Sequence, residues 1–214
     1  MRPLDLRGVR AAAVDLDGTL VRLSIDYDAL RGRVRALLAD AGDADPGELR
    51  PLLAGIDAAA RRLGRPDVRD RALALIDEAE TRAAADATLL PGAREAMLAL
   101  AERKVRLAIF SRTCRAAVLA CLERFAFPPM EVVAREDVAR PKPHPEALLR
   151  LQRAFDVPAA ALLVVGDHVY DAQAARAAGC PCVAVPTGVS TRAALAAEGA
   201  LVLDTLDRLP ELLS

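Results

Sequence analysis

The sequence lacks tryptophan, and aromatic residues make up only 3% of its 214 residues. This scarcity argues against a surface that stacks bases or sugars on aromatic rings. The 29 basic and 30 acidic residues nearly cancel, so the basic excess of a nucleic-acid binder is missing too. No apolar run approaches the roughly 20 residues that span a bilayer, and Met1 to Asp5 do not resemble a signal peptide. We therefore expect a compact cytoplasmic protein that binds neither nucleic acid nor membranes, as a monomer or a homodimer.

Lysine and cysteine are also rare. Only Lys104 and Lys142 are lysines, whereas the other 27 basic residues are arginines, so a lysine at position 142 needs a reason. The four cysteines do not have the spacing of a metal site, and we expect them to be buried thiols without a chemical role: Cys114, Cys121, Cys180 and Cys182.

The first part of the chain changes character after a short apolar run. Residues 9–14 have the composition of a buried strand that ends at Asp15. From about residue 21 to residue 88, apolar residues recur at helical spacing, and no segment has the pattern of a strand. Within this block, Asp45 and Glu48 have the spacing of a capping box, but Pro51 must then kink that helix or restart it.

From residue 90 onward, helical segments alternate with short apolar segments. Helices are expected at 93–103, 113–125, 145–155, 172–178 and 192–197, and strands at 105–110, 131–134, 161–165, 182–185 and 201–203. This alternation is typical of a parallel sheet covered by helices on both faces. The sequence therefore predicts a doubly wound α/β core, residues 1–20 and 89–214, with an all-helical insertion at 21–88.

Polar residues follow several of the expected strands. Asp15 and Asp17 leave the first strand on the same side, and Gly18 allows a tight turn beside a ligand. Ser111 follows the strand at 105–110, and Lys142 lies between two prolines. A fourth motif, Gly166-Asp167 with Asp171 one helical turn later, follows the strand at 161–165. In an open α/β sheet, ligands bind at this end of the strands.

Converging carboxylates repel one another unless a cation holds them, and oxygen ligands suit Mg²⁺. Lys142 and Ser111 could then bind the oxygens of a substrate phosphate. One carboxylate could act as a nucleophile and the second as a proton donor and acceptor. Each motif alone is common in turns and helix caps, and Ser111 by itself would be a helix N-cap. Four such motifs in order, each expected at a strand end, favour the functional interpretation.

Together these four motifs resemble those of the haloacid dehalogenase superfamily, over nearly the whole chain. The resemblance implies a Rossmann-like core, with Asp15 as nucleophile and Asp17 as general acid and base. Ser111 and Lys142 would stabilise the phosphoryl group. The metal ligands it implies for Mg²⁺ are Asp15, the backbone carbonyl of Asp17, Asp167, and Asp171 as ligand or support.

The insertion resembles the small cap of the phosphoglycolate-phosphatase-like branch. Related dehalogenases lack an acidic residue at the place of Asp17, phosphonate-cleaving relatives need a cap lysine, and sugar-phosphate mutases use cap histidine and lysine. The insertion contains neither lysine nor histidine. We therefore expect a phosphatase of small, phosphoglycolate-like monoesters that works through an aspartyl-phosphate. The alternatives are a sugar-phosphate mutase or phosphotransferase of the same fold and a non-catalytic scaffold that binds a phosphorylated metabolite.

Several other residues are candidates for substrate contact. Gly18, Thr19, Arg22 and Arg112 lie next to the motifs, although Arg22 could instead pair with the core and Arg112 could be an exposed side chain. We expect His168 to be a solvated or helix-capping residue and His144 to lie at a helix N-terminus. Possible specificity residues of the insertion are Asp26, Tyr27, Arg65 and Arg69.

Overall fold

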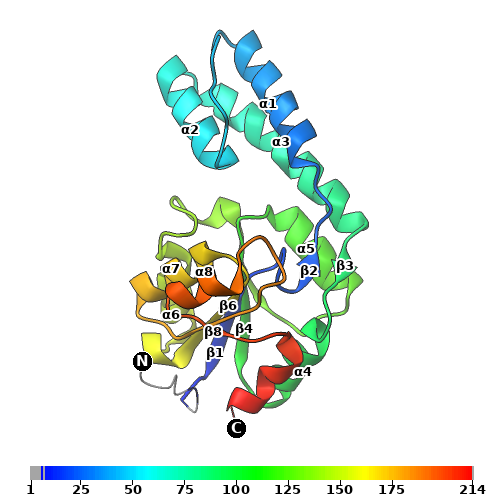
Figure 1. Cartoon of the computed structure of the whole chain (residues 1–214), viewed down its shortest axis with the longest axis vertical. Coiled ribbons are helices and arrows are strands. Elements are labelled where there is room, and N and C mark those ends of the chain that lie inside the picture. The colour runs from blue at the N-terminus through cyan, green and yellow to red at the C-terminus, as the bar shows by residue number, and fades with distance from the viewer. Residues whose placement is uncertain (1–5, 7, 214) are drawn as a thin grey trace. The chain divides into compact units, whose positions relative to one another are not determined.

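The computed structural model describes Leu6 and residues 8–213, so the expectation for Met1 to Asp5 lies outside the described residues (Figure 1). The chain divides into two compact units. The core unit contains Met1–Leu23 and Ala84–Ser214, and the helical unit contains Ser24–Ala83. Across the described part of the chain, every helix is too short or too polar to span a bilayer.

The core unit is built on a six-stranded parallel sheet with the order β5-β4-β1-β6-β7-β8. Its strands are β1 (Ala11–Val14), β4 (Arg106–Phe110), β5 (Glu131–Val133), β6 (Leu162–Gly166), β7 (Cys182–Ala184) and β8 (Leu201–Val202). In the centre, Ala11 of β1 aligns with Arg106 of β4 and with Leu162 of β6. All four residues of β1 are fully buried, as expected for a central parallel strand covered on both faces. The predicted α/β fold class is confirmed.

Helices connect the strands of the sheet and cover it. They are α4 (Ala93–Glu102), α5 (Arg115–Arg124), α6 (Glu146–Phe155), α7 (Val169–Ala178) and α8 (Arg192–Ala197), with short 3₁₀ turns η1 (Arg135–Asp137), η2 (Ala159–Ala161), η3 (Leu206–Arg208) and η4 (Pro210–Leu213). Ala11 and Ala13 of β1 pack in one cluster with Leu148 and Leu151 of α6 and with residues of α7. Because neighbouring residues of a strand face opposite sides, Ala12 and Val14 point to the other face.

The helical unit contains three helices around their own apolar core. α1 (Tyr27–Asp40), α2 (Leu52–Leu63) and α3 (Pro66–Ala85) bury residues that include Val34, Ile56 and Ala72. Pro51 is the N-cap of α2, so a helix begins directly after the proline. The expected helix start at Asp45 is wrong. Asp45 instead accepts a hydrogen bond from the Gly47 N–H within a turn, because a short carboxylate competes well for nearby backbone donors.

The ends of the block 21–88 also differ from expectation. β2 (Val21–Arg22) and β3 (Thr88–Leu89) form a two-stranded antiparallel ribbon, although no strand is expected from the sequence pattern of this block. Strands of two residues are too short to produce an alternating pattern, which explains the error. The compact helical unit, Ser24–Ala83, is correspondingly shorter than the predicted insertion.

Candidate active site

The sheet brings the polar motifs to one edge. β4, β1, β6 and β7 are neighbours, so the residues that follow them lie side by side. The Asp15 N–H donates to the Val165 carbonyl over 2.8 Å, and the Ser111 N–H donates to the Val133 carbonyl over 3.0 Å. The hydrogen-bond ladder thus continues to Asp15 and Ser111, and it fixes the backbone from which these side chains project. Lys142 instead lies in the loop that leads into α6, so the expectation that every motif directly follows a strand is wrong for Lys142.

Three carboxylates meet at this edge. One oxygen from each of Asp15, Asp167 and Asp171 lies within 4.8 Å of the others, and all three residues are buried. Burial, followed by the charges of Asp15 and Asp171, raises the pKa of Asp167 to about 8. Burial is also the main cause that raises the pKa of Asp171. The shifts therefore arise mainly because burial disfavours the ionised carboxylates, and repulsion between the carboxylates adds to this effect.

Lys142 is the cation inside this cluster. Its Nζ lies 2.8 Å from Asp15 Oδ1 and 2.6 Å from Asp171 Oδ1, and its side chain is 5% exposed. The same ammonium lies 4.1 Å from the centre of the Phe110 ring. Burial opposes its charge, but the attraction of Asp15 and Asp171 outweighs burial and raises the pKa of Lys142. A compact ammonium with rotatable donors fits this space, which accounts for a lysine in a chain that otherwise uses arginine.

Hydrogen bonds hold the other acidic side chains. Asp17 Oδ1 accepts from the Leu23 N–H over 2.8 Å, and the Asp17 side chain is not part of the three-carboxylate cluster. The Thr19 hydroxyl donates to Asp167 Oδ1 over 2.9 Å. Asp171 accepts from Lys142 through one oxygen and from the His168 N–H, at 3.0 Å, through the other. Both carboxylate oxygens of Asp171 therefore accept hydrogen bonds, whereas Asp167 Oδ1 accepts one, from the Thr19 hydroxyl.

Sequence reasoning missed a fifth segment, the loop that follows β7. The Thr187 hydroxyl donates to the Gly18 carbonyl, and the Thr187 carbonyl accepts from Arg22 over 3.0 Å. A Cβ at Gly188 would lie 1.7 Å from Asp167 Oδ2, and one at Gly18 would lie 2.5 Å from the same oxygen. Gly18 also has a φ of +86°, which favours glycine. The sequence Pro186-Thr187-Gly188, directly after the expected strand at 182–185, could have indicated that this loop reaches the site.

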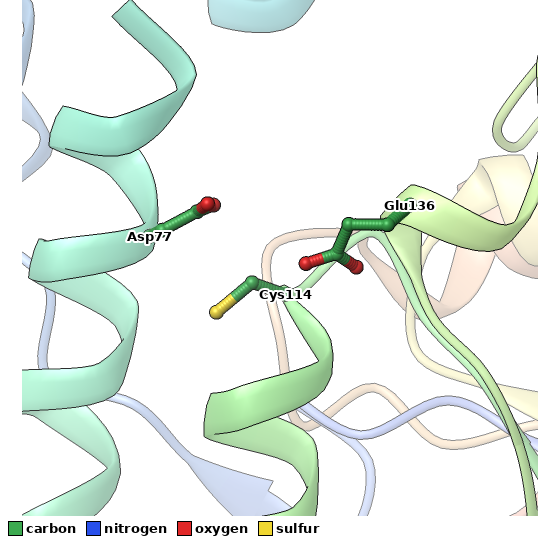
Figure 2. Close-up of side chains that lie close together, drawn as sticks. All are labelled: Asp77, Cys114 and Glu136. Carbon is green, nitrogen blue, oxygen red and sulfur yellow. The ribbon is translucent and has the colours of Figure 1, made fainter. Parts of the chain in front are cut away.

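Ser111 lies in a loop that leads into α5. Its hydroxyl accepts from the Thr113 N–H over 3.2 Å, so it caps a local turn and not the helix itself, which begins at Arg115. Figure 2 shows Cys114 at the start of α5 and the Glu136 carboxylate directed toward that helix terminus. Both Glu136 oxygens accept from the Arg115 N–H, at 3.2 and 3.1 Å. Asp77, also drawn there, belongs to the helical unit.

Arg112 and Arg22 have different surroundings. The Arg112 guanidinium carbon lies 5.2 Å from the centre of the Tyr170 ring, and that ring lies 4.5 Å from the imidazole of His168. Arg22 donates to a backbone carbonyl of the core unit, which corresponds to the structural alternative expected for it. His168 is the N-cap of α7 and accepts from the Tyr170 N–H through Nδ1, so the expected capping role is observed.

The remaining candidates lie in structural positions. His144 accepts from the Glu146 N–H at the start of α6, as expected. Asp26 is the N-cap of α1, where it accepts from two backbone N–H groups. Arg65 and Arg69 form exposed ion pairs with Asp67 and Asp57, and Tyr27 is 43% exposed. All four cysteines are buried free thiols; burial raises the pKa of Cys121 to about 11, and it also raises the pKa values of Cys180 and Cys182.

The donor set of the carboxylate cluster fits Mg²⁺. It consists of carboxylate oxygens alone, and Mg²⁺ prefers hard oxygen ligands in proteins. Three carboxylates share one lysine here, and burial followed by the neighbouring carboxylates raises the pKa of Asp167, so an additional positive charge would favour its ionised form.

Comparisons with known proteins agree with this geometry. The family model described as haloacid dehalogenase-like hydrolase matches residues 9–179. The chain is similar to the plasmid-encoded phosphoglycolate phosphatase of Cupriavidus necator, at 32% identity over 95% of this chain and 93% of that protein. It is also similar to the phosphoglycolate phosphatase of Rhodospirillum rubrum, at 33% identity over 91% and 86%.

Among solved structures, CbbY from Rhodobacter sphaeroides in complex with phosphate is similar, with a TM-score of 0.68 and 25% identity over 94% of this chain and 96% of that one. A mutant of CbbY has been solved in complex with xylulose-(1,5)bisphosphate and gives a TM-score of 0.67.

Proposed function

The chain belongs to the haloacid dehalogenase-like hydrolase family, and we propose that it is a Mg²⁺-dependent phosphatase of small phosphomonoesters, phosphoglycolate-like ones in particular. The observation that carries this proposal is the position of Asp15. It directly follows β1, is 2.8 Å from buried Lys142, and shares its surroundings with Asp167 and Asp171. A carboxylate in such a place can attack an ester that is bound through its phosphate.

In the first step, an Asp15 oxygen attacks phosphorus and the bond between phosphorus and the ester oxygen breaks. Asp17 gives its proton to the departing alkoxide. In the second step, a water molecule loses a proton to Asp17 and attacks the phosphorus of the aspartyl-phosphate. Inorganic phosphate leaves, and the Asp15 carboxylate and the Asp17 acid are restored.

The neighbouring side chains supply positioning and charge. Lys142 and the Ser111 hydroxyl would bind the phosphoryl oxygens that are not attacked. Gly18 and Thr19 act on Asp167: Gly18 leaves space for its carboxylate, and the Thr19 hydroxyl donates to it. Asp171, with both oxygens occupied, is proposed to hold Lys142 and the start of α7 in place. The metal would be held by Asp15, Asp167 and the Asp17 backbone carbonyl, and it would neutralise the phosphate dianion while the protein groups act.

The preference for small esters is supported by the relatives, which are named phosphoglycolate phosphatases and align over most of their length. We propose that residues 21–88 restrict the size of the substrate, as the small caps of this branch do. A mutase or phosphotransferase is disfavoured because the helical unit offers no lysine or histidine to control proton transfer. The cytoplasmic location remains an expectation from the sequence.

Phosphate release from phosphoglycolate tests the proposal. We expect turnover with Mg²⁺, none with EDTA, and a loss of at least about 1,000-fold in kcat for Asp15→Asn, since this change removes the nucleophile but keeps its shape. Circular dichroism would establish that the variant is folded. Transfer of the phosphoryl group to a second hydroxyl compound in place of water would favour the phosphotransferase alternative. The absence of turnover with every small ester would favour the scaffold.

A further inference from the structure

Arg112 is a cation at the edge of the site that does not have a carboxylate partner among the described residues. Its side chain forms one described contact, with the ring of Tyr170. Arg115, three residues later, is by contrast in an ion pair with Asp137. An aromatic face attracts a guanidinium without using its five N–H donors. The Arg112 side chain is therefore held in place while its hydrogen-bonding groups remain available.

The position of Arg112 is set from both ends. At the backbone, its carbonyl accepts from Arg135 Nη1 over 2.6 Å, and its neighbour Ser111 directly follows β4. At the side chain, Tyr170 belongs to the first turn of α7, and Asp171 is the next residue. The guanidinium thus lies beside the turn that carries the third carboxylate, and not on a distant surface.

We propose that Arg112, held by Tyr170, binds a carboxylate on the leaving group of the substrate and so determines specificity for phosphorylated hydroxy acids. The inference rests on the proposed phosphatase function. Lys142 is already paired with Asp15 and Asp171, whereas Arg112 has no carboxylate partner among the described residues, so its charge is available to a second anionic group. A planar guanidinium binds a carboxylate through two parallel hydrogen bonds, and one positive charge matches one carboxylate better than a phosphate dianion.

The test compares three esters: phosphoglycolate, neutral 2-hydroxyethyl phosphate and ethylene glycol bisphosphate. For Arg112→Met, we expect the ratio of kcat/KM for phosphoglycolate over 2-hydroxyethyl phosphate to fall by about 10- to 100-fold, mainly through KM, as for a lost charge-assisted pair. Arg112→Lys should lose less, because the charge remains. Arg176→Met is the matched control: it removes the same charge from the far end of α7, where Arg176 pairs with Glu198.

Tyr170 is proposed to position the Arg112 guanidinium, and its variants test this role through the same ratio of kcat/KM values. Tyr170→Phe keeps the ring face and should keep the ratio, whereas Tyr170→Leu should lower the ratio in the same direction as Arg112→Met. An equal loss on all three esters for Arg112→Met would overturn the inference and leave the proposed function standing. A loss confined to the bisphosphate would overturn the choice of carboxylate. If the unmodified protein releases phosphate from none of the esters, the proposed function fails and the inference fails with it.

Discussion

At the scale of single residues, the protonation of Asp167 makes the stability of the protein depend on pH. Its pKa is raised from 3.8 to about 8, mainly by burial and then by Asp15 and Asp171. Between these values the folded protein holds a proton that the unfolded chain has lost, so the free energy of unfolding falls as the pH rises. A bound Mg²⁺ would compensate for the charge once that proton leaves.

We therefore expect the stabilisation by Mg²⁺ to be larger at pH 8.5 than at pH 5.5. Thermal unfolding in EDTA and in Mg²⁺ at the two pH values measures it. Asp167→Asn removes the charge, so this variant should lose most of the difference between the two pH values. A melting shift of the same size at both values in the unmodified protein would contradict the assignment of the cluster as a metal site.

Gly188 tests how closely the loop after β7 controls Asp167. A methyl group at this position would lie 1.7 Å from Asp167 Oδ2, so Gly188→Ala must displace the carboxylate or the loop. A displacement of about 1 Å at a reacting centre reduces activity on the order of 100-fold. We expect a loss of that size in kcat/KM.

Gly32→Ala is the control for this change. Gly32 lies within α1, and a Cβ there would meet no atom within 4 Å. This variant should keep its activity and gain about 0.5–1 kcal/mol of helix stability. Full activity in Gly188→Ala would show that the loop does not constrain Asp167.

At the scale of elements, helix termini explain several residues that were candidates for substrate recognition. Asp26 accepts from the N–H groups of Asp28 and Ala29, at 3.1 and 2.9 Å, and so begins α1. Asp26→Ala should lower the free energy of unfolding by about 1 kcal/mol, the usual cost of losing an N-cap, whereas Asp26→Asn should lose much less. Denaturant unfolding measures this cost. An increase in KM without loss of stability would instead support the role in specificity.

The strand ends could be predicted from sequence because parallel strands end at one edge of the sheet. Short apolar runs before Asp15, Ser111 and Asp167 were sufficient to expect these residues close together, and the structure brings them to one edge. The contact of Thr187 with Gly18 could not be expected, since it joins positions 169 residues apart without a local pattern. The pairing of Lys142 with Asp171, which are 29 residues apart, also has no local pattern, and the sequence suggested only that both would lie near a phosphate.

At the scale of the whole molecule, the four motifs and the helical insertion belong to different compact units. The sheet, with β1 at its centre, fixes the chemical groups, and the helical unit is inserted directly after the first motif. α1, α2 and α3 have their own apolar core. The core unit carries the four motifs to which we assign the phosphoryl chemistry.

The proposed mechanism requires that Asp15 form a covalent phosphoryl intermediate, which mass spectrometry of a quenched reaction can detect. In Asp17→Asn the second step is slowed, because water has lost its base, while p-nitrophenyl phosphate needs little help from an acid in the first step. With Mg²⁺ and this ester, we predict that the peptide containing Asp15 gains the mass of one phosphoryl group and loses it on treatment with hydroxylamine. A phosphoryl group found on another residue, or phosphate release without any modified peptide, would contradict the account.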